Sequence, residues 1–170
     1  MEKNSIIQKA HDLGYEYESK FGNCAQCTVA AVQDALGLKN DHIFQVASGF
    51  GGGIGRNCDG VCGGYSGGVI LISSFLGRTR ENITDKDCMI DGYNTASLLH
   101  DKFIAQYGTV ICTDIHNILF GRTFNLRDQN DMNIFNNLGA HVDKCTSVVG
   151  QAAAWTAEIL LEELKKRESK

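Results

Sequence analysis

"CGGYSGGVILISSFLG", residues 62–77, is the stretch of sequence that decides the fold. It is apolar almost all round, so a helix formed here would be buried rather than lie on the surface. Each glycine inside a helix costs about 1 kcal/mol relative to alanine. The glycines therefore indicate close approach of another backbone or of a bulky cofactor, and we expect a buried central helix. The glycines concerned are Gly63, Gly64, Gly67 and Gly68.

The residues just before this helix, from Gly49 to Cys62, form a glycine-rich segment that also carries cysteine. Glycine-rich loops often bind phosphate, through a G-x-G-x-x-G or a G-x-x-x-x-G-K-[ST] pattern. Neither pattern is present, because the third glycine position falls on Ile54, Arg56 or Cys58, and no Gly-Lys pair occurs. Cysteine chemistry is therefore a better explanation of this segment than phosphate binding.

Apolar side chains recur at helical spacing on both sides of this segment. In residues 5–21 the predicted stripe consists of Ile6, Ala10, Leu13, Tyr17 and Phe21. Asn23 fits the N-cap of one such helix, and Gly37 fits its left-handed end. Residues 121–140 are polar and irregular, and we expect a surface excursion there. The predicted helices lie within residues 5–21, 24–37, 40–50, 62–77, 84–108, 109–121 and 143–167.

The whole chain favours one helical domain. Strand-like alternation, repeats and linkers do not stand out, and the absence of proline leaves long helices without a breaker. A chain of 170 residues that is 43% hydrophobic can bury a core of its own. We predict an all-α fold over residues 1–170, a compact bundle of about five to seven helices with a glycine-rich loop that carries cysteines.

Charge and hydropathy exclude several classes of partner. A net charge of −4 gives no basic surface of the kind that nucleic acid or anionic lipid requires. The start of the chain has no apolar core of signal-peptide length, and the longest apolar run, residues 69–76, is too short to span a membrane. We expect a cytoplasmic protein that binds neither nucleic acid nor membrane; a bundle of this size is also compatible with a homodimer.

The seven cysteines are too few for a disulfide-rich scaffold, and their odd number in a reducing compartment favours thiol, metal or redox chemistry. Four of them lie at predicted helix starts, where the partial positive charge should stabilise a thiolate and lower the thiol pKa. These four are Cys24, Cys62, Cys112 and Cys145. The other three are Cys27 and Cys58, each close in sequence to one of the four, and Cys88, for which a role as apolar filler is favoured.

The segments around these cysteines resemble the C_GCAxxG_C_C family of redox-active proteins almost from end to end. The resemblance rests on FGNCAQCTVAAVQDALGL (21–38), ASGFGGGIGRNCDGVCGGYSG (47–67), QYGTVICTDI (106–115) and CTSVVGQAAAWTAEIL (145–160). It implies that Cys24, Cys62, Cys112 and Cys145 are the four family cysteines. The motif here reads CGGYSG, with Gly64 where the family has alanine. A related domain in split-Soret cytochromes suggests an iron–sulfur centre, although the C-x-x-C-H motif for haem attachment is missing here.

Two redox chemistries fit these cysteines. The first is electron transfer, to an unidentified redox partner protein, through an iron–sulfur cluster; its ligands would be Cys24, Cys62, Cys112 and Cys145. The second is metal-free thiol–disulfide exchange, with Cys62 as the nucleophile and Cys58 or Cys24 as the resolving thiol. The protein would be an oxidoreductase in the second case and an electron carrier in the first.

A third hypothesis is a structural or regulatory zinc site. Cys112 lies four residues before His116, and Cys145 lies four residues after His141. One helical turn separates the members of each pair, so both side chains can face the same ion. Neither spacing matches a standard zinc finger.

Overall fold

The computed structural model describes residues 2–168, and these fold as α-helices joined by loops. The all-α prediction is confirmed, but the described residues form eight α-helices where about five to seven were expected. The helices are α1 (Lys3–Phe21), α2 (Cys24–Leu36), α3 (Asp41–Val46), α4 (Gly63–Leu76), α5 (Lys86–Tyr107), α6 (Cys112–Phe120), α7 (Gln129–Asn137) and α8 (Cys145–Glu168). A 3₁₀ turn, Ala47–Phe50, follows α3, and a π-helical turn, Ala140–Lys144, leads into α8.

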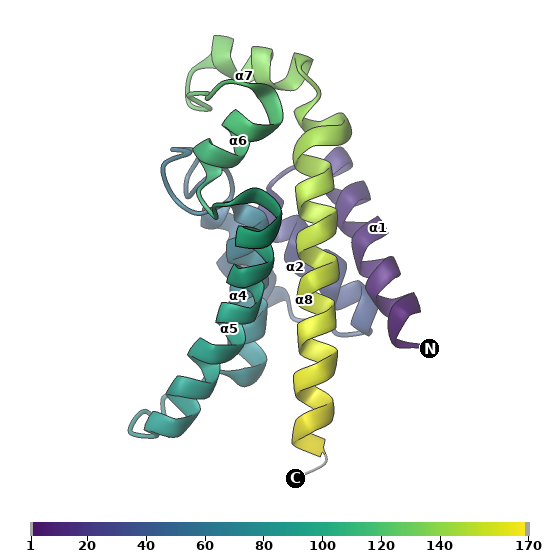
Figure 1. Cartoon of the computed structure of the whole chain (residues 1–170), viewed down its shortest axis with the longest axis vertical. Helices are drawn as coiled ribbons and strands as arrows, with labels where there is room; N and C mark the ends of the chain where they lie inside the picture. Colours follow the sequence, from purple (N-terminus) through teal and green to yellow (C-terminus); the bar gives the residue numbers. More distant parts are fainter. Residues whose placement is uncertain (1, 169–170) are drawn as a thin grey trace.

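The core lies where α1, α2, α4 and α8 pack together. The long α8 runs through most of the height of the molecule, with α1 on one side of it, α4 on the other and α2 behind it (Figure 1). Small and branched apolar side chains fill the space between these helices; the fully buried ones include Ala25, Val29, Val32, Leu71, Ile72, Ala152, Ala153 and Leu160. We refer to these four helices as the bundle.

The glycines of α4 let α2 and α8 approach closely, which confirms the expectation that another backbone lies against them. A β-carbon on Gly67 would lie 2.5 Å from the carbonyl oxygen of Ala25 in α2. By contrast, a β-carbon on Gly64 would lie 3.2 Å from the Cβ of Ala152 in α8. Alanine at position 64 therefore needs only a small adjustment, whereas a side chain at position 67 would push α2 away.

The buried face of α1 differs from the predicted stripe at its C-terminal end. Phe21 was expected on the apolar stripe, but its side chain is 74% exposed. The buried positions are instead Ala10, Gly14 and Glu18, which follow one another at intervals of four residues. The reason is that Gly14 allows a close contact with α8, since a β-carbon there would lie 2.9 Å from the carbonyl oxygen of Val149.

The segment after α6 is ordered and partly buried, so the prediction of an irregular surface excursion over 121–140 is wrong. It forms α7 and a second apolar cluster, in which Phe124, Leu126, Phe135 and Ala140 are buried. Hydrophobic side chains isolated among polar ones gave no helical stripe, which is why periodicity missed them. We call residues 112–140, including α6 and α7, the cap; it lies at the top of Figure 1.

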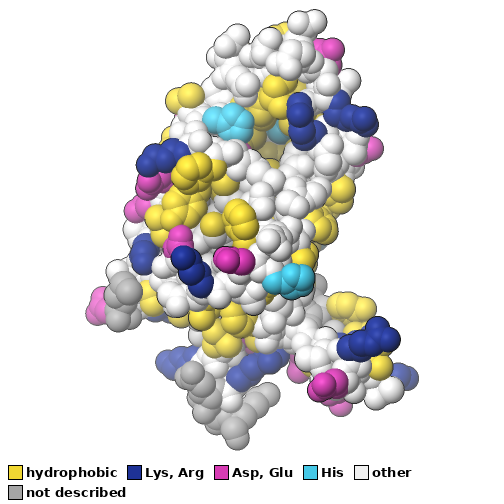
Figure 2. Space-filling view, turned by 180° about the vertical axis from the view of Figure 1, so that it is seen from behind, with side chains coloured by type: hydrophobic (Ala, Val, Ile, Leu, Met, Phe, Trp, Pro, Cys, Tyr) yellow, Lys and Arg dark blue, Asp and Glu magenta, His cyan; other side chains and the backbone are white. Residues whose placement is uncertain are grey.

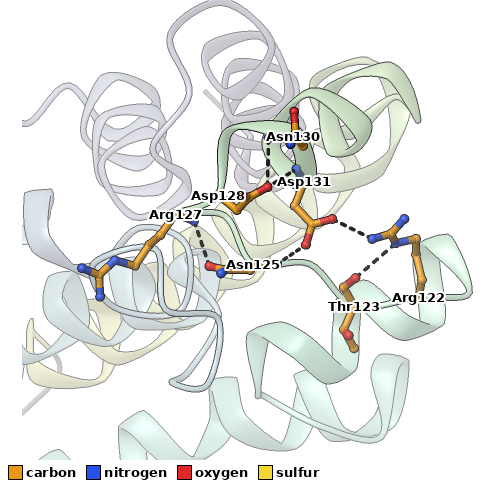
Figure 3. Close-up of polar contacts among 7 residues, drawn as sticks. All are labelled: Arg122, Thr123, Asn125, Arg127, Asp128, Asn130 and Asp131. Atoms are coloured by element: carbon orange, nitrogen blue, oxygen red, sulfur yellow. Dashed lines mark hydrogen bonds and ion pairs between the residues drawn. The ribbon is translucent and has the colours of Figure 1, made fainter.

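Polar contacts fix the turn between α6 and α7 (Figure 3). Asp128 caps α7 by accepting hydrogen bonds from the backbone N–H groups of Asn130 and Asp131 at 2.9 Å. The carboxylate of Asp131 in turn accepts from the Arg122 guanidinium and from the Asn125 N–H, both at 2.8 Å. The Asp and Asn residues that made this segment look irregular in sequence therefore cap α7 and form the hydrogen bonds that hold the turn.

The N-terminal half of α5 and the loop before it project from the bundle, as both views show (Figures 1 and 2). The predicted helix is present, and its buried positions are Thr95, Leu99 and Phe103. None of the helices in the described part of the chain is long and apolar enough to cross a membrane.

Candidate functional site

A cavity of about 370 Å³ lies between the bundle and the cap, and thiols from four helices line it. Cys24 is the first residue of α2, Cys62 is the N-cap of α4, Cys112 is the first residue of α6, and Cys145 is the first residue of α8. The structure thus brings the four predicted ligand residues to one cavity, although more than a hundred residues of chain separate the first from the last. Figure 2 shows a hollow in the upper part of the molecule, beside a histidine side chain.

The glycine-rich segment is tied by backbone hydrogen bonds to the strand-like residues that precede α6. Val61 and Ile111 form an isolated β-bridge. Around it, the Cys62 N–H donates to the Val110 carbonyl at 2.7 Å, and the Cys112 N–H donates to the Gly60 carbonyl at 2.9 Å. These bonds hold the segment that carries Cys62 against the segment that carries Cys112, although the two cysteines lie fifty residues apart in sequence.

Cys58, Cys112 and His116 form a compact group at the cap side of the cavity. The Sγ of Cys112 lies 3.6 Å from Nε2 of His116, and all three potential ligand atoms lie within 4.8 Å of one another. The three residues are only 2%, 4% and 3% exposed. Gly53 makes this approach possible, because a β-carbon there would lie 2.7 Å from both the Cα of Cys58 and the Cβ of Cys112.

Aromatic rings enclose His116 in the cap. The centroid of its ring lies 5.8, 5.7 and 5.0 Å from those of Phe120, Phe124 and Phe135. Its Nδ1 is buried and has no hydrogen-bond partner among residues 2–168. The ring is therefore held by packing, with Nε2 directed to the Cys112 sulfur.

Burial decides the protonation of the thiols on the bundle side, so the expectation that helix starts lower their pKa is wrong. Burial raises the pKa of Cys24, even though the N–H groups of Gly52 and Gly63 favour its thiolate. It also raises the pKa of Cys62, against the N–H groups of Tyr65 and Gly64. Removing a charged sulfur from water costs more free energy than one or two N–H groups return.

Cys145 shows the same effect for an additional reason. Burial raises its pKa well above the ordinary value, and the neighbouring charges of Cys24 and Glu18 raise it further. The π-helical turn Ala140–Lys144 runs directly into α8, so Cys145 lies inside a continuous helical path rather than at a free N-terminus. The prediction that Cys145 belongs to the first turn of its helix is confirmed, but the lowered pKa expected from that position is wrong.

Cys58 differs from these thiols. A hydrogen bond from the Cys112 thiol is the largest cause that lowers the pKa of Cys58, and His116 and the Leu126 N–H lower it further, against the opposing effect of burial. The same hydrogen bond and burial raise the pKa of Cys112. The pKa shifts of the two thiols are therefore opposite in direction.

A buried carboxylate at the cavity was not predicted from the sequence. Glu18 lines the cavity with 3% exposure, and its Oε2 has no hydrogen-bond partner among the described residues. Its Oε1 lies 3.4 Å from Nδ1 of His141, an ion-pair distance without hydrogen-bond alignment, and this charge raises the pKa of His141. The spacing of Glu18 from Ala10 and Gly14 could have placed it on the buried face of α1.

The remaining cysteines lie outside the lining of the cavity. Cys27 is buried in α2, and its thiol donates to the Gly22 carbonyl at 2.8 Å. Cys88 lies at the start of α5, with its sulfur 4.0 Å from the Leu76 carbonyl oxygen. Of the two cysteine–histidine pairs predicted for zinc, Cys112 contacts His116, whereas His141 lies beside Glu18.

A family model described as "Putative redox-active protein (C_GCAxxG_C_C)" matches residues 22–159, which is most of the chain. The protein belongs to the C_GCAxxG_C_C family. Neither the curated proteins nor the solved structures contain a significant match. The match to the C_GCAxxG_C_C family includes every cysteine of the chain and both histidines of the cavity, while Glu18 lies just before the matched segment.

Membership of the C_GCAxxG_C_C family and the geometry agree on the kind of site. The family is described by its cysteines and by redox activity. In this member, four thiols and His116 line the cavity. Cys58 lies beside Cys112 and His116. Thiolates and imidazole are the donors that zinc, iron and iron–sulfur clusters use in proteins, so this donor set can hold a metal.

Proposed function

We propose that the protein is an electron carrier that holds an iron–sulfur cluster in the cavity and exchanges electrons with a separate redox protein. The proposed ligands are the four thiols of Cys24, Cys62, Cys112 and Cys145. The observation that carries the proposal is that these thiols, from four different helices, line the same cavity. Four cysteine ligands are the usual number for [2Fe–2S] and [4Fe–4S] clusters.

The surroundings of the thiols support this function. N–H groups of Gly52 and Gly63 face the sulfur of Cys24, and those of Gly64 and Tyr65 face that of Cys62. Such N–H groups stabilise negative charge on sulfur and tune the reduction potential of a cluster. The cluster would supply one-electron chemistry, and the chain would hold it, exclude water from it and offer it these donors.

The raised thiol pKa values set a condition for loading. In the metal-free protein, burial keeps the thiols of Cys24, Cys62 and Cys145 protonated at neutral pH. Thiols must lose their protons to bind metal, so loading releases protons and is favoured by a higher pH. The same burial protects the site from solvent once it is loaded.

The direct test is anaerobic reconstitution with iron and sulfide, followed by the visible spectrum and by iron and sulfide analysis. We expect broad thiolate-to-iron absorption in the wild type, and loss of most bound iron and sulfide in Cys24→Ser and Cys62→Ser. Cys88→Ser is the matched control, because Cys88 lies outside the cavity. Full iron and sulfide content in Cys62→Ser, with an unchanged spectrum, would show that the ligand assignment is wrong.

A specific observation also favours a second function, metal-free thiol–disulfide exchange. The thiolate of Cys58 lies within 4.8 Å of the Cys112 sulfur, so the geometry favours this pair, in place of the predicted pairing of Cys58 with Cys62. Oxidation by a small-molecule disulfide would form the Cys58–Cys112 bond and break the disulfide of the oxidant, which takes two electrons and the Cys112 proton and leaves as one thiol and one thiolate. Peptide mapping of metal-free protein in a glutathione redox buffer tests this pairing, which a Cys24–Cys62 disulfide would contradict.

A further inference from the structure

The group formed by Cys58, Cys112 and His116 uses two residues that the proposed cluster does not need. Cys58 is additional to the four family cysteines, and His116 belongs to the aromatic cap. Their donor atoms nevertheless converge with that of Cys112 within 4.8 Å, and no other group of three or more Cys, His, Asp or Glu residues within residues 2–168 does so. A pair of sulfurs and an imidazole nitrogen are donors typical of zinc.

The separation of the donor atoms already matches tetrahedral zinc. Bond lengths of about 2.3 Å to sulfur and about 2.0–2.1 Å to nitrogen, at tetrahedral angles, put a sulfur and a nitrogen ligand about 3.6 Å apart. The distance between Sγ of Cys112 and Nε2 of His116 is 3.6 Å. The same bond lengths put two sulfur ligands about 3.8 Å apart, so Cys58 needs only a small adjustment from its present position.

Charge also fits a divalent cation. Cysteine binds a metal as thiolate and histidine as neutral imidazole, so two thiolates and a neutral imidazole would surround the ion. Two negative charges then cancel the charge of Zn²⁺, so the buried site is neutral and the desolvation cost falls. The rings of Phe120, Phe124 and Phe135 keep the imidazole in place without an ionic partner.

We propose that Cys58, Cys112 and His116 bind a single Zn²⁺ ion, with the fourth coordination position open to the cavity. Both Cys112 and His116 line the cavity, so the fourth position faces it. Three protein ligands and one open position are the arrangement of catalytic rather than structural zinc sites, where water or substrate completes the coordination.

The backbone conformation of Cys58 supports a functional role for its thiol. Cys58 has φ +65°, in the left-handed region that costs a non-glycine residue about 1–2 kcal/mol. The strained conformation is held by a hydrogen bond from the Cys58 N–H to the Gly52 carbonyl at 3.0 Å and by one from the Thr113 N–H to the Cys58 carbonyl at 2.8 Å. The loop thus has a cysteine beside Cys112 at a position where glycine would adopt the same φ without strain.

The zinc site shares Cys112 with the proposed cluster, so zinc and the cluster would be alternative occupants, and the zinc site is tested in iron-free, fully reduced protein. A Cys24→Ser background removes one thiol of the bundle side while it leaves the three proposed zinc ligands intact. Titration with Co²⁺, displaced by Zn²⁺, should show one equivalent of bound metal, with sulfur-to-cobalt charge transfer and the d–d bands of tetrahedral cobalt. Zinc X-ray absorption should show two sulfur ligands and at least one nitrogen ligand.

Two further substitutions in that background decide the assignment. We expect His116→Ala and Cys58→Gly each to weaken zinc binding by more than about 100-fold, since loss of even an outer-shell partner costs roughly 10–100-fold. Cys58→Gly is chosen because glycine suits φ +65°, so lost binding cannot be attributed to a strained loop. Far-UV circular dichroism of both variants should remain that of the parent.

The outcomes are separable from those of the cluster experiment. Zinc affinity within threefold of the parent in Cys58→Gly or His116→Ala overturns the proposal, as does protein that binds no zinc. If Cys24→Ser itself abolishes zinc binding, zinc occupies the cavity thiols instead and the proposal also fails. The iron content of Cys24→Ser and Cys62→Ser tests the cluster independently, because neither residue belongs to the zinc site.

Discussion

The bundle wall and the cap wall of the cavity are built from different side chains. On the bundle side, glycine, alanine and valine let the helices α1, α2, α4 and α8 pack closely. Three cavity cysteines lie among them, of which Cys62 is buried and Cys24 and Cys145 are partly buried. On the cap side, phenylalanine rings surround a histidine and the thiols of Cys58 and Cys112. On the bundle side the pKa of each cavity thiol is raised, whereas on the cap side it is raised for Cys112 and lowered for Cys58.

The difference shows that burial by itself does not fix the charge of a thiol. Cys62 is buried beside backbone N–H groups, and burial prevails, so its pKa is raised. Cys58 is buried as well, but the neighbouring Cys112 thiol and His116 favour its thiolate, and its pKa is lowered. Donors on side chains that can approach the sulfur closely outweigh desolvation, whereas the N–H groups of a helix start do not.

The largest expected effect comes from removing an aromatic side chain of the cap wall. Phe135 is 4% exposed and contacts His116, Phe120 and Phe124, so Phe135→Ala should lose about 3–5 kcal/mol of unfolding free energy. Denaturant unfolding, followed by circular dichroism, measures this loss. Phe21→Ala is the matched control, because Phe21 is 74% exposed and should change stability by less than about 0.5 kcal/mol. Equal effects of the two substitutions would contradict the burial of the cap.

The next largest effect comes from adding a β-carbon to a glycine of the bundle wall. Gly67→Ala puts a β-carbon 2.5 Å from the Ala25 carbonyl oxygen, and we expect a loss of about 2 kcal/mol from overpacking. Gly64→Ala should cost less than about 1 kcal/mol, since the nearest atom, in Ala152, is 3.2 Å away and belongs to a side chain. Thermal and denaturant unfolding of the two variants compare them. A larger loss for Gly64→Ala would mean that α4 approaches α8 more closely than α2.

The pH dependence of the unfolding free energy distinguishes thiols with raised pKa values from those with lowered ones. Burial raises the folded-state pKa of Cys62 above its ordinary value of 9.0. The stability that this group contributes is fully present below the unfolded-state pKa and is lost as pH rises above it, because only the unfolded chain then releases the proton. Metal-free protein should lose up to about 1 kcal/mol per thiol per pH unit above pH 9.

Unfolding free energies at pH 8, 9 and 10 measure this slope. Cys62→Ser should make the slope shallower, because serine does not ionise in this range. Cys58→Ser should not make it shallower, since the pKa of Cys58 is lowered rather than raised. Equal slopes in the wild type and Cys62→Ser would show that Cys62 is accessible to water.

The smallest effect lies where the two walls meet, at Glu18 and His141. Because the buried carboxylate of Glu18 raises the pKa of His141, Glu18→Gln should lower that pKa, as proton NMR of the imidazole can show. The ion pair's stabilisation is fully present below the unfolded-state pKa of histidine and is lost as pH rises through the raised folded-state value. The side chain of His141 is 37% exposed, so this gain should remain below about 1 kcal/mol. An unchanged histidine titration would mean that the two groups do not interact in solution.

Periodicity predicted the helices whose apolar stripes are regular. The caps of α2 are confirmed: Asn23 Oδ1 accepts a hydrogen bond from the Gln26 N–H at 3.4 Å, and Gly37 is left-handed with φ +69°. Periodicity failed for α7, because its stability comes from Phe135 and from caps rather than from a stripe. It also misplaced the end of the α1 stripe, where a close contact at Gly14 turns Glu18 inward.

The sequence by itself determined the helical class, most of the helices and the family, since these depend on local spacing and on motifs. The tertiary structure alone decided which side chains meet. It placed Cys58 and His116 beside Cys112, and it brought Glu18 into the cavity. It also decided the charge of each thiol, because a pKa depends on water and donors that reach the sulfur from distant parts of the chain.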